Sequence, residues 1–524
     1  MAALAPSPAP PAAAPGGVPA PAADSRRGGW MVWAWLLGAV GVSLVVTVQS
    51  LRDPDVWWHL AVGNLIRAHG IPSREPFTFL GAPNPWVGQQ WGYEVALSWM
   101  YGVAAWLPMV TMGLVASAAF VVAVRSVPRA LRVPGPFLAA AMLIGTIVAG
   151  TFLGVRGQVI TLLGTAVVLW VVARWREGSA RAVWLLPPLF LVWANLHAGF
   201  VTGFAVVLLV LLTVAVWRRV DPASAPAAPL RPLLVALLAG AVATLANPAG
   251  VHLYPYIYET FANPSLTNGI TEWMSPDFHL TALRIFEVGA VLLVVLWALS
   301  RRPDPLDVVL GVAVLAASLQ AQRNVALFAV VAAPQIARYG WLAWTTWESR
   351  PRLAAFSRPR PVLPALLMAA AVCVVTAVAY VVPLSRASRV SRDMAHDFPV
   401  AAADYVAAHD AGQRMYSLYE WGGYLAWRFP TARTVYIYGE SAVFGSARME
   451  QYLDIHLVRP GWQAELDGMT VAIVPAESQE ATAFTEIGWT VQCHDATSDS
   501  VVMHTTLGSG PTQTPPDPRS APAC

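Results

Sequence analysis

The sequence contains no lysine and little charge of either sign. All 33 basic residues are arginine, only 12% of the 524 residues are charged, and 56% are hydrophobic. A chain with so little charge and so much apolar surface is expected to have lipid as its main solvent. Its net charge of +3 is too small to indicate nucleic acid as a partner.

Cysteine is scarce as well. The three cysteines are Cys373, inside an apolar run, and Cys493 and Cys524 near the end of the chain. None of them has the paired spacing of a metal site. Cys493 and Cys524 could pair as a disulfide, although their spacing alone does not require it.

The apolar residues gather in runs that are long enough, or nearly long enough, to cross a bilayer as helices. Up to residue 384, the loops that eleven crossings would place inside hold 18 arginines, and those placed outside hold six. Because arginine is enriched in cytoplasmic loops, the N-terminus is predicted inside and everything after residue 384 outside. The eleven predicted spans are 30–48, 105–124, 135–153, 158–174, 183–195, 200–217, 230–247, 282–300, 305–320, 325–342 and 361–384.

The predicted fold is therefore a polytopic α-helical membrane protein with a small C-terminal α/β domain. Residues 1–29 are rich in Ala and Pro and read as a disordered cytoplasmic tail. The transmembrane domain covers 30–384, and its first outer loop is 50–91. In 385–504 helix-like stretches alternate with β-rich runs, which indicates an extracytoplasmic α/β domain. The Pro-, Ser- and Thr-rich segment 505–524 is predicted to be disordered.

The first outer loop opens with LRDPDVWWHLAV. Asp53 suits the N-cap of a helix that ends near Gly70, and Asp55 suits its first turn, with the two following tryptophans as interfacial anchors. A second interpretation also holds. Asp53 precedes a proline and should be extended, so both carboxylates can share one face. They would then act as a general base and its partner, or as oxygen ligands of a divalent cation.

A polar turn, NLHAG, follows the short apolar run 183–194. As a helix that run is only about 18 Å long and contains Pro-Pro, so the turn should lie below the membrane surface. Irregular backbone at that depth requires a protein-lined or wet neighbour. Asn195 and His197 therefore either line a cavity or simply cap two helices, and the sequence does not choose between these two roles.

Several motifs together resemble a known family. DPDVWWHLAVGNLIRAHGIPSREPFTF, WVGQQWGYEVAL, VRGQVITLL, LVWANLHAGF, LANPAGVHLYP, GITEWMSPDF, AQRNVALFAVVAAP and YSLYEWGGYLAWRFPTARTVYIYGES occur in the order found in one branch of the bacterial GT-C superfamily of membrane glycosyltransferases. The resemblance covers roughly 30–505. Where that branch commonly has Asp-Gly-Arg, this chain has Tyr438-Gly439-Glu440. Any role of the acidic and basic residues of Asp-Gly-Arg therefore does not carry over to this chain.

The resemblance implies an inverting transfer of a sugar from a polyprenyl-phosphate carrier to an acceptor on the outer face. The superfamily's catalytic carboxylate carries over onto Asp53, with Asp55 as the second candidate and as its partner in any metal site. Arg156 and Arg323 stand at outer span ends, where they suit a lipid phosphate or merely snorkel. The further candidates for substrate binding are His59, Glu94, Asn195, His197 and Glu272.

The implied partners are the lipid-linked sugar, membrane lipids and an acceptor whose identity the sequence leaves open. No cofactor is indicated beyond a divalent cation as an option. Two other functions fit the same features. A transporter or flippase of lipid-linked glycans would share the polar cavity, although the sequence shows no internal repeat of the transporter kind. A scaffold would keep the fold without chemistry.

Overall fold

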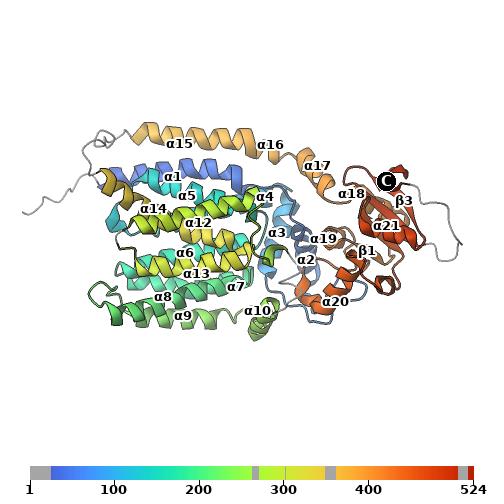
Figure 1. Ribbon diagram of the computed structural model, residues 1–524, viewed down its shortest axis with the longest axis horizontal. Helices are drawn as coiled ribbons and strands as arrows, with labels where there is room; N and C mark the ends of the chain where they lie inside the picture. Colours follow the sequence, from blue (N-terminus) through green and yellow to red (C-terminus); the bar gives the residue numbers. More distant parts are fainter. Residues whose placement is uncertain (1–24, 263–270, 301, 349–361, 506–516) are drawn as a thin grey trace, which may run out of the picture.

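The computed structural model describes residues 25–262, 271–300, 302–348, 362–505 and 517–524. It consists of a bundle of long helices, a layer of shorter helices at one end of the bundle, and a small domain beyond that layer (Figure 1). The predicted tail 1–29 therefore falls mostly outside the described residues, and the first helix begins at Ser25.

Seven helical segments of the described chain are long and apolar enough to cross a membrane, and a bent pair, 368–384 with 387–397, would make an eighth. Three shorter apolar segments lie among them, at 180–196, 230–243 and 305–320. The protein is thus a multi-pass membrane protein. The bundle helices are α1 (Ser25–Thr47), α4 (Leu107–Val124), α5 (Gly135–Ala149), α6 (Gln158–Arg176), α7 (Leu186–Leu196), α8 (Phe200–Val220), α9 (Leu230–Ala243), α12 (Thr281–Leu299), α13 (Pro305–Gln320), α14 (Val325–Glu348) and α15 (Val362–Thr376).

Charged side chains gather at both ends of the bundle, and at one end they form a network of ion pairs. At the end away from the small domain, Asp304 caps α13 and pairs with Arg176 at 2.6 Å and Arg338 at 3.1 Å. Asp307 pairs with Arg338 at 2.7 Å. These acidic and basic groups satisfy one another, so this network reads as structural.

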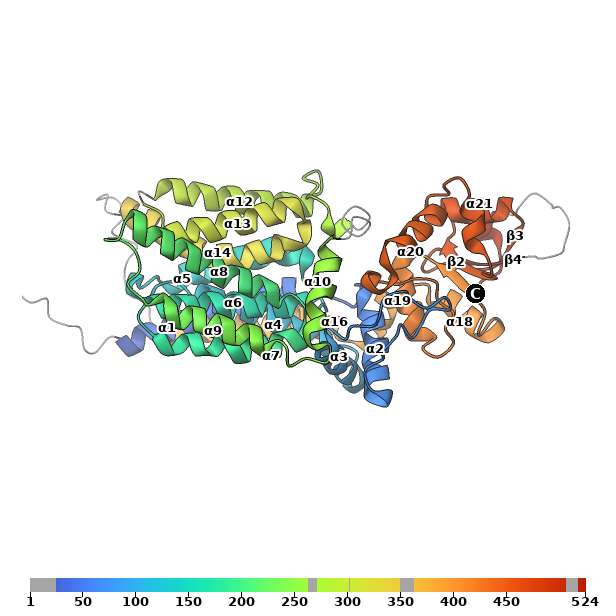
Figure 2. The same cartoon turned by 90° about the horizontal axis from the view of Figure 1, so that it is seen from below.

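The other end carries the layer of short helices. The connection between α1 and α4 folds into α2 (Asp55–His69) and α3 (Trp91–Val103), which pack side by side, and α10 (Leu253–Ala262) lies beside them. Figure 2 shows these helices between the bundle and the small domain. The layer therefore places Asp55, His59 and Glu94 between the helical bundle and the small domain.

The small domain is an α/β domain, as its alternating sequence pattern predicts. Its sheet has the order β1-β2-β4-β3, in which β1 and β2 are parallel and the other pairs antiparallel. One of the β-rich runs of the sequence, RTVYIY at 433–438, is not a strand but an irregular segment with isolated bridges from Val435. The elements are α17 (Ala387–Asp397), α18 (Val400–His409), β1 (Met415–Ser417), α19 (Tyr419–Arg428), α20 (Ser441–His456), β2 (Val471–Pro475), α21 (Gln479–Glu486), β3 (Trp489–Asp495) and β4 (Ser500–Thr505).

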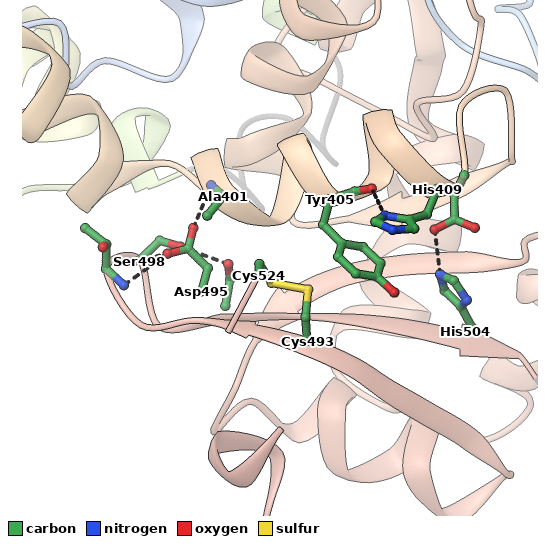
Figure 3. The surroundings of a disulfide bond; sticks show 11 residues. Ala401, Tyr405, His409, Cys493, Asp495, Ser498, His504 and Cys524 are labelled. Atoms are coloured by element: carbon green, nitrogen blue, oxygen red, sulfur yellow. Dashed lines mark hydrogen bonds and ion pairs between the residues drawn. A yellow bond between two sulfur atoms is a disulfide. The ribbon is translucent and has the colours of Figure 1, made fainter. Parts of the chain in front are cut away.

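Residues 517–524, the described part of the end of the segment 505–524 that the sequence predicts to be disordered, lie on this sheet, and residues 506–516 lie outside the described residues. Cys493 and Cys524 form a disulfide whose Cα atoms are 5.0 Å apart (Figure 3). The backbone of His494 exchanges hydrogen bonds with the same terminal segment. Residues 517–524 thereby cover part of β3, which would otherwise be an open edge of the sheet.

The connection between α1 and α4 is built into the small domain. Thr78 forms a bridge with Val435, and the buried carboxylate of Glu75 accepts bonds from the backbone of Phe77, from Thr78 and from the hydroxyl of Tyr438. A carboxylate with several donors is one of the strongest anchors available to a buried loop. The loop and the domain therefore form one structural unit.

Tryptophans complete this contact. Trp57 is fully buried, and its ring lies 5.5 Å from those of Phe398 and Tyr424 and 5.0 Å from that of Trp427. The interpretation of Trp57 and its neighbour Trp58 as lipid-interface anchors is therefore wrong. They are core residues that join α2 to the small domain, because burying large rings between two elements stabilises their contact.

Candidate functional site

Three charged side chains meet where the bundle faces the α2–α3 layer. Arg156, in the turn before α6, donates through Nε to the carboxylate of Asp53 and through Nη1 to that of Glu272. Along the chain, Arg156 is 103 residues from Asp53 and 116 residues from Glu272. The side chains are largely shielded from solvent, with 9% of the Asp53 side chain exposed. Arg156 therefore neutralises one carboxylate and shares its charge with a second.

Asp53 also has the local role that its position before α2 predicts. Its Oδ1 accepts the backbone N–H of Asp55 at 3.0 Å, where the helix begins. One oxygen thus serves the helix start and the other serves Arg156. Asp53 therefore bonds the first residue of α2, although Pro54 occupies the N-cap position itself, and its role as a site residue stays a prediction.

Asp55 has a different environment. Its Oδ1 accepts the indole N–H of Trp58 at 3.0 Å, and among the described residues it has no ion-pair partner. Burial raises the pKa of Asp55 to about 6, although the bond from Trp58 opposes that shift. The Asp55 carboxylate is therefore ionised at neutral pH but binds a proton readily, which suits a general base.

His59 and Glu94 face each other from α2 and α3. His59 Nδ1 lies 3.2 Å from Glu94 Oε1, and Glu94 is only 2% exposed. Burial lowers the pKa of His59 and raises the pKa of Glu94, so the pair is best described as a neutral acid donating to a neutral imidazole. The other carboxyl oxygen of Glu94 is buried and has no partner among the described residues.

His197 lies at the base of the site, at the end of α7. Its Nδ1 accepts the backbone N–H of Gly199 at 3.0 Å and lies 2.8 Å from the Thr161 hydroxyl. Its ring packs on Gly157, the residue after Arg156, where an added Cβ would be 2.8 Å away. Burial lowers the pKa of His197 to about 3, so the ring is neutral.

Asn195 joins three elements. Its Oδ1 accepts the indole N–H of Trp91 at 2.8 Å, and its Nδ2 donates to the carbonyls of Leu191 and Ala246, both at 2.9 Å. Both ends of the amide are used within the protein, so Asn195 holds α3 against α7.

Arg323 approaches from the turn between α13 and α14. Its guanidinium lies 4.2 Å above the ring of Trp273, the residue after Glu272. The two turns are tied together because Gln322 donates its backbone N–H to the carbonyl of Met274 at 2.9 Å. Among the described residues, no hydrogen bond acceptor reaches the Arg323 guanidinium, so its donors remain available to an anion.

The small domain contributes residues that the sequence does not single out as site candidates. Glu440 accepts a hydrogen bond from the hydroxyl of Tyr256 in α10, and that hydroxyl accepts one from Gln89 at 3.1 Å. Burial, opposed by the bond from Tyr256 and supported by the charge of Asp55, raises the pKa of Glu440 to about 7. The sequence signal for Glu440 is the segment Tyr438-Gly439-Glu440 itself, which stands where the family it resembles commonly has Asp-Gly-Arg.

Metal binding by the two aspartates does not fit this arrangement. Asp53 is committed to Arg156, and within the described ranges no group of three or more His, Cys, Asp or Glu side chains converges on one point. A hard divalent cation needs several oxygen ligands. Arg156 instead compensates the charges of Asp53 and Glu272.

The fold and the site define a multi-pass membrane protein with buried carboxyl groups and arginines between its helical bundle and a small α/β domain. Among solved structures, the archaeal oligosaccharyltransferase AglB from Archaeoglobus fulgidus, in complex with an inhibitory peptide and a dolichol-phosphate, is similar to this chain. The identity is 12%, the similarity covers 92% of this chain and 75% of that chain, and the TM-score is 0.48. No protein-family profile and no curated protein matches the chain. Its activity has to be inferred from its own side chains.

Proposed function

We propose that the protein is an inverting membrane glycosyltransferase that moves a sugar from a polyprenyl-phosphate carrier to an acceptor on the extracytoplasmic face. The observation that carries the proposal is the half-buried carboxyl of Asp55, which accepts a bond from Trp58, has no ion-pair partner among the described residues, and has its pKa raised to about 6. It lies in a polar cluster that also contains two arginines, Arg156 and Arg323. A proton acceptor near cations is the arrangement that attack by a hydroxyl and departure of a phosphate require.

In this reaction the acceptor oxygen bonds to the anomeric carbon on the face opposite the phosphate. The hydroxyl proton passes to Asp55, and the bond from the anomeric carbon to the phosphate oxygen breaks, leaving its electron pair on the phosphate. The base contributes about 10²- to 10⁴-fold to the rate. Arg323, whose guanidinium has no acceptor within the described part of the chain, binds the leaving phosphate.

The family resemblance favours Asp53 as the base, but in this structure Asp55 is better suited to accept a proton. The carboxylate of Asp53 would have to give up its bond to Arg156 before accepting a proton, whereas Asp55 would lose only a bond from Trp58. Asp53 is therefore assigned the role of orienting Arg156 and starting α2. His59, Glu94, His197 and Glu272 surround the two aspartates, and Asn195 supports them.

The lipid carrier requires that the site lie at the membrane surface. We propose that the seven long segments, the bent pair and the three shorter segments all cross the membrane, which gives eleven spans. The arginine distribution then places the N-terminus in the cytoplasm and the small domain outside. The phosphate of a polyprenyl carrier would sit at the level of α2 and α3 while its chain remains in the bilayer.

The test is transfer by the purified protein from a panel of polyprenyl-phosphate sugars, with membrane extract as acceptor source and release of free polyprenyl phosphate as the readout. Asp55→Asn keeps the size of the side chain but not its basicity, so turnover should fall by about 10²-fold or more. Asp467→Asn is the matched control, because Asp467 is exposed on the small domain.

Three outcomes contradict the proposal. Undiminished turnover by Asp55→Asn removes Asp55 as the base. Movement of lipid-linked sugar across vesicle membranes without any release of polyprenyl phosphate indicates a transporter or flippase. No turnover and no movement by the wild-type protein with any sugar of the panel indicates a scaffold.

A further inference from the structure

One turn of the small domain reaches into the polar cluster. Tyr438 donates to Glu75 at 3.1 Å, and Glu440 accepts from Tyr256. Between them, Gly439 packs so closely on Asp55 that a Cβ at this position would overlap Asp55 Oδ1. Three consecutive residues of the domain thus contact the α1–α4 connection, Asp55 and α10.

Glu440 is buried, with 7% of the residue exposed, yet it is not part of an ion pair among the described residues. One carboxyl oxygen accepts the Tyr256 hydroxyl, and no hydrogen bond from a described residue reaches the other. Structural carboxylates in this protein look different: Glu75 receives several donors and Asp304 receives two arginines. The second oxygen of Glu440 is not sealed in the protein interior, so it is available to a hydroxyl group of a ligand.

We propose that Glu440 is a substrate-binding residue whose second carboxyl oxygen hydrogen-bonds a sugar hydroxyl next to Asp55, so that the small domain selects the sugar. This inference rests on the proposed glycosyl transfer. Hydroxyl groups donate and accept, and a carboxyl that changes between its acid and its anion near neutral pH can accept from them or donate to them. The raised pKa of Glu440, about 7, supports this use.

The surrounding residues fix the carboxyl in place. Gln89 donates to the Tyr256 oxygen at 3.1 Å, and the Tyr256 hydroxyl donates to Glu440. The bond from Gln89 therefore orients the Tyr256 hydroxyl as a donor to the carboxyl of Glu440. Gly439 allows the turn to come within contact of Asp55. A hydroxyl bound to Glu440 would therefore be held beside the base at a defined position, which is the usual way in which a site discriminates between hydroxyl patterns.

The test compares Glu440→Gln with wild type over the same panel of polyprenyl-phosphate sugars. Glutamine keeps the oxygen that accepts from Tyr256 but removes the titrating acid. We expect KM to rise about tenfold or more for the preferred sugar, with a smaller change in kcat, and the preference between sugars to narrow. Asp55→Asn should instead lower kcat. Tyr256→Phe leaves Glu440 unoriented and should raise KM in the same direction.

A second measurement does not depend on turnover. Because burial raises the pKa of Glu440 from 4.5 to about 7, its contribution to stability is fully present below pH 4.5 and is lost as pH rises through about 7. The melting temperature of wild type relative to Glu440→Gln should therefore decline over that interval.

The outcomes separate the two proposals. If the wild type transfers no sugar, glycosyl transfer itself fails. If the wild type transfers sugar but Glu440→Gln and Tyr256→Phe keep its KM and its sugar preference, the role of Glu440 is overturned. A pH-independent difference in melting temperature overturns it as well, because a carboxyl without that shift is not the buried, partly unpartnered group described here. If Glu440→Gln does not fold, Tyr256→Phe decides.

Discussion

Replacing Gly439 by alanine should separate the site from the stability of the fold. Gly439 does not have a positive φ, so alanine creates no backbone strain there. Its Cβ would, however, overlap Asp55 Oδ1 and lie 2.7 Å from the indole nitrogen of Trp58, whereas ordinary contact begins at about 3.4 Å. The hydrogen bond between Asp55 and Trp58 lies directly in the path of the new methyl group.

The magnitude follows from this overlap. The carboxyl of Asp55 has to move by about 1 Å or more, and a misplacement of that size at a reacting group costs about 10²-fold in rate. Overpacking a buried contact costs about 1–3 kcal/mol of the free energy of unfolding. We therefore expect Gly439→Ala to remain folded with a modestly lower melting temperature and to lose transfer almost as completely as Asp55→Asn.

Gly102→Ala is the matched control. Gly102 lies in α3, and the atom nearest to its added Cβ, Arg67 Nη1, is 4.0 Å away. In a helix this change should be neutral or stabilising by about 0.5–1 kcal/mol. The measurements are the transfer rates and the melting temperatures of both variants in detergent, each compared with wild type. If Gly439→Ala behaves like Gly102→Ala in both measurements, the small domain does not contact Asp55 as described, and the reasoning fails.

Three further predictions concern topology, the disulfide and pH. In a variant without its unpaired cysteine, single cysteines at the exposed positions Ser73 and Ala411 should react with an impermeant thiol reagent in intact cells, and one at Ala223 should not; labelling at Ala223 alone would invert the orientation. Cys524→Ser should lower the unfolding free energy of the small domain by about 3–4 kcal/mol, because the disulfide closes a loop with a sequence separation of 31; identical denaturant midpoints would contradict this. If Asp55 is the base, kcat/KM should rise with pH through about 6 and be about tenfold higher at pH 7 than at pH 5; a flat profile over this range would exclude Asp55.

Local patterns in the sequence predicted the local structure well. The long apolar runs became helices, the alternating pattern after residue 385 became an α/β domain, and Asp53 bonds the start of α2 as a residue before Pro54 should. These features depend on neighbours along the chain, which periodicity and capping rules describe. The run at 433–438 failed as a strand because its backbone partners, Thr78 and Met415, allow only isolated bridges.

The partners of the site residues could not be predicted in the same way. Asp53 and Arg156 are separated by 103 residues, and Tyr256 and Glu440 by 184. Nothing in the local pattern of either residue identifies its partner, because these pairs arise only when helices and loops are assembled. Both members of the first pair were candidates, but no local pattern indicates that Arg156 pairs with Asp53 while Asp55 bonds only Trp58 among the described residues.

The glycines of the EWGGYLAW motif explain why the small domain cannot be treated as a separate module. A Cβ on Gly423 would lie 2.7 Å from the carbonyl oxygen of Pro54 and 3.2 Å from the Trp58 ring, so α19 packs directly against the start of α2. That is the turn that carries Asp53 and Asp55. Since the domain supplies one donor to Glu75 and the rings of Phe398, Tyr424 and Trp427 around Trp57, removing it would leave Glu75 without that donor and expose a large ring beside the site. The domain therefore contributes to the geometry of the two aspartates even where it makes no contact with a substrate.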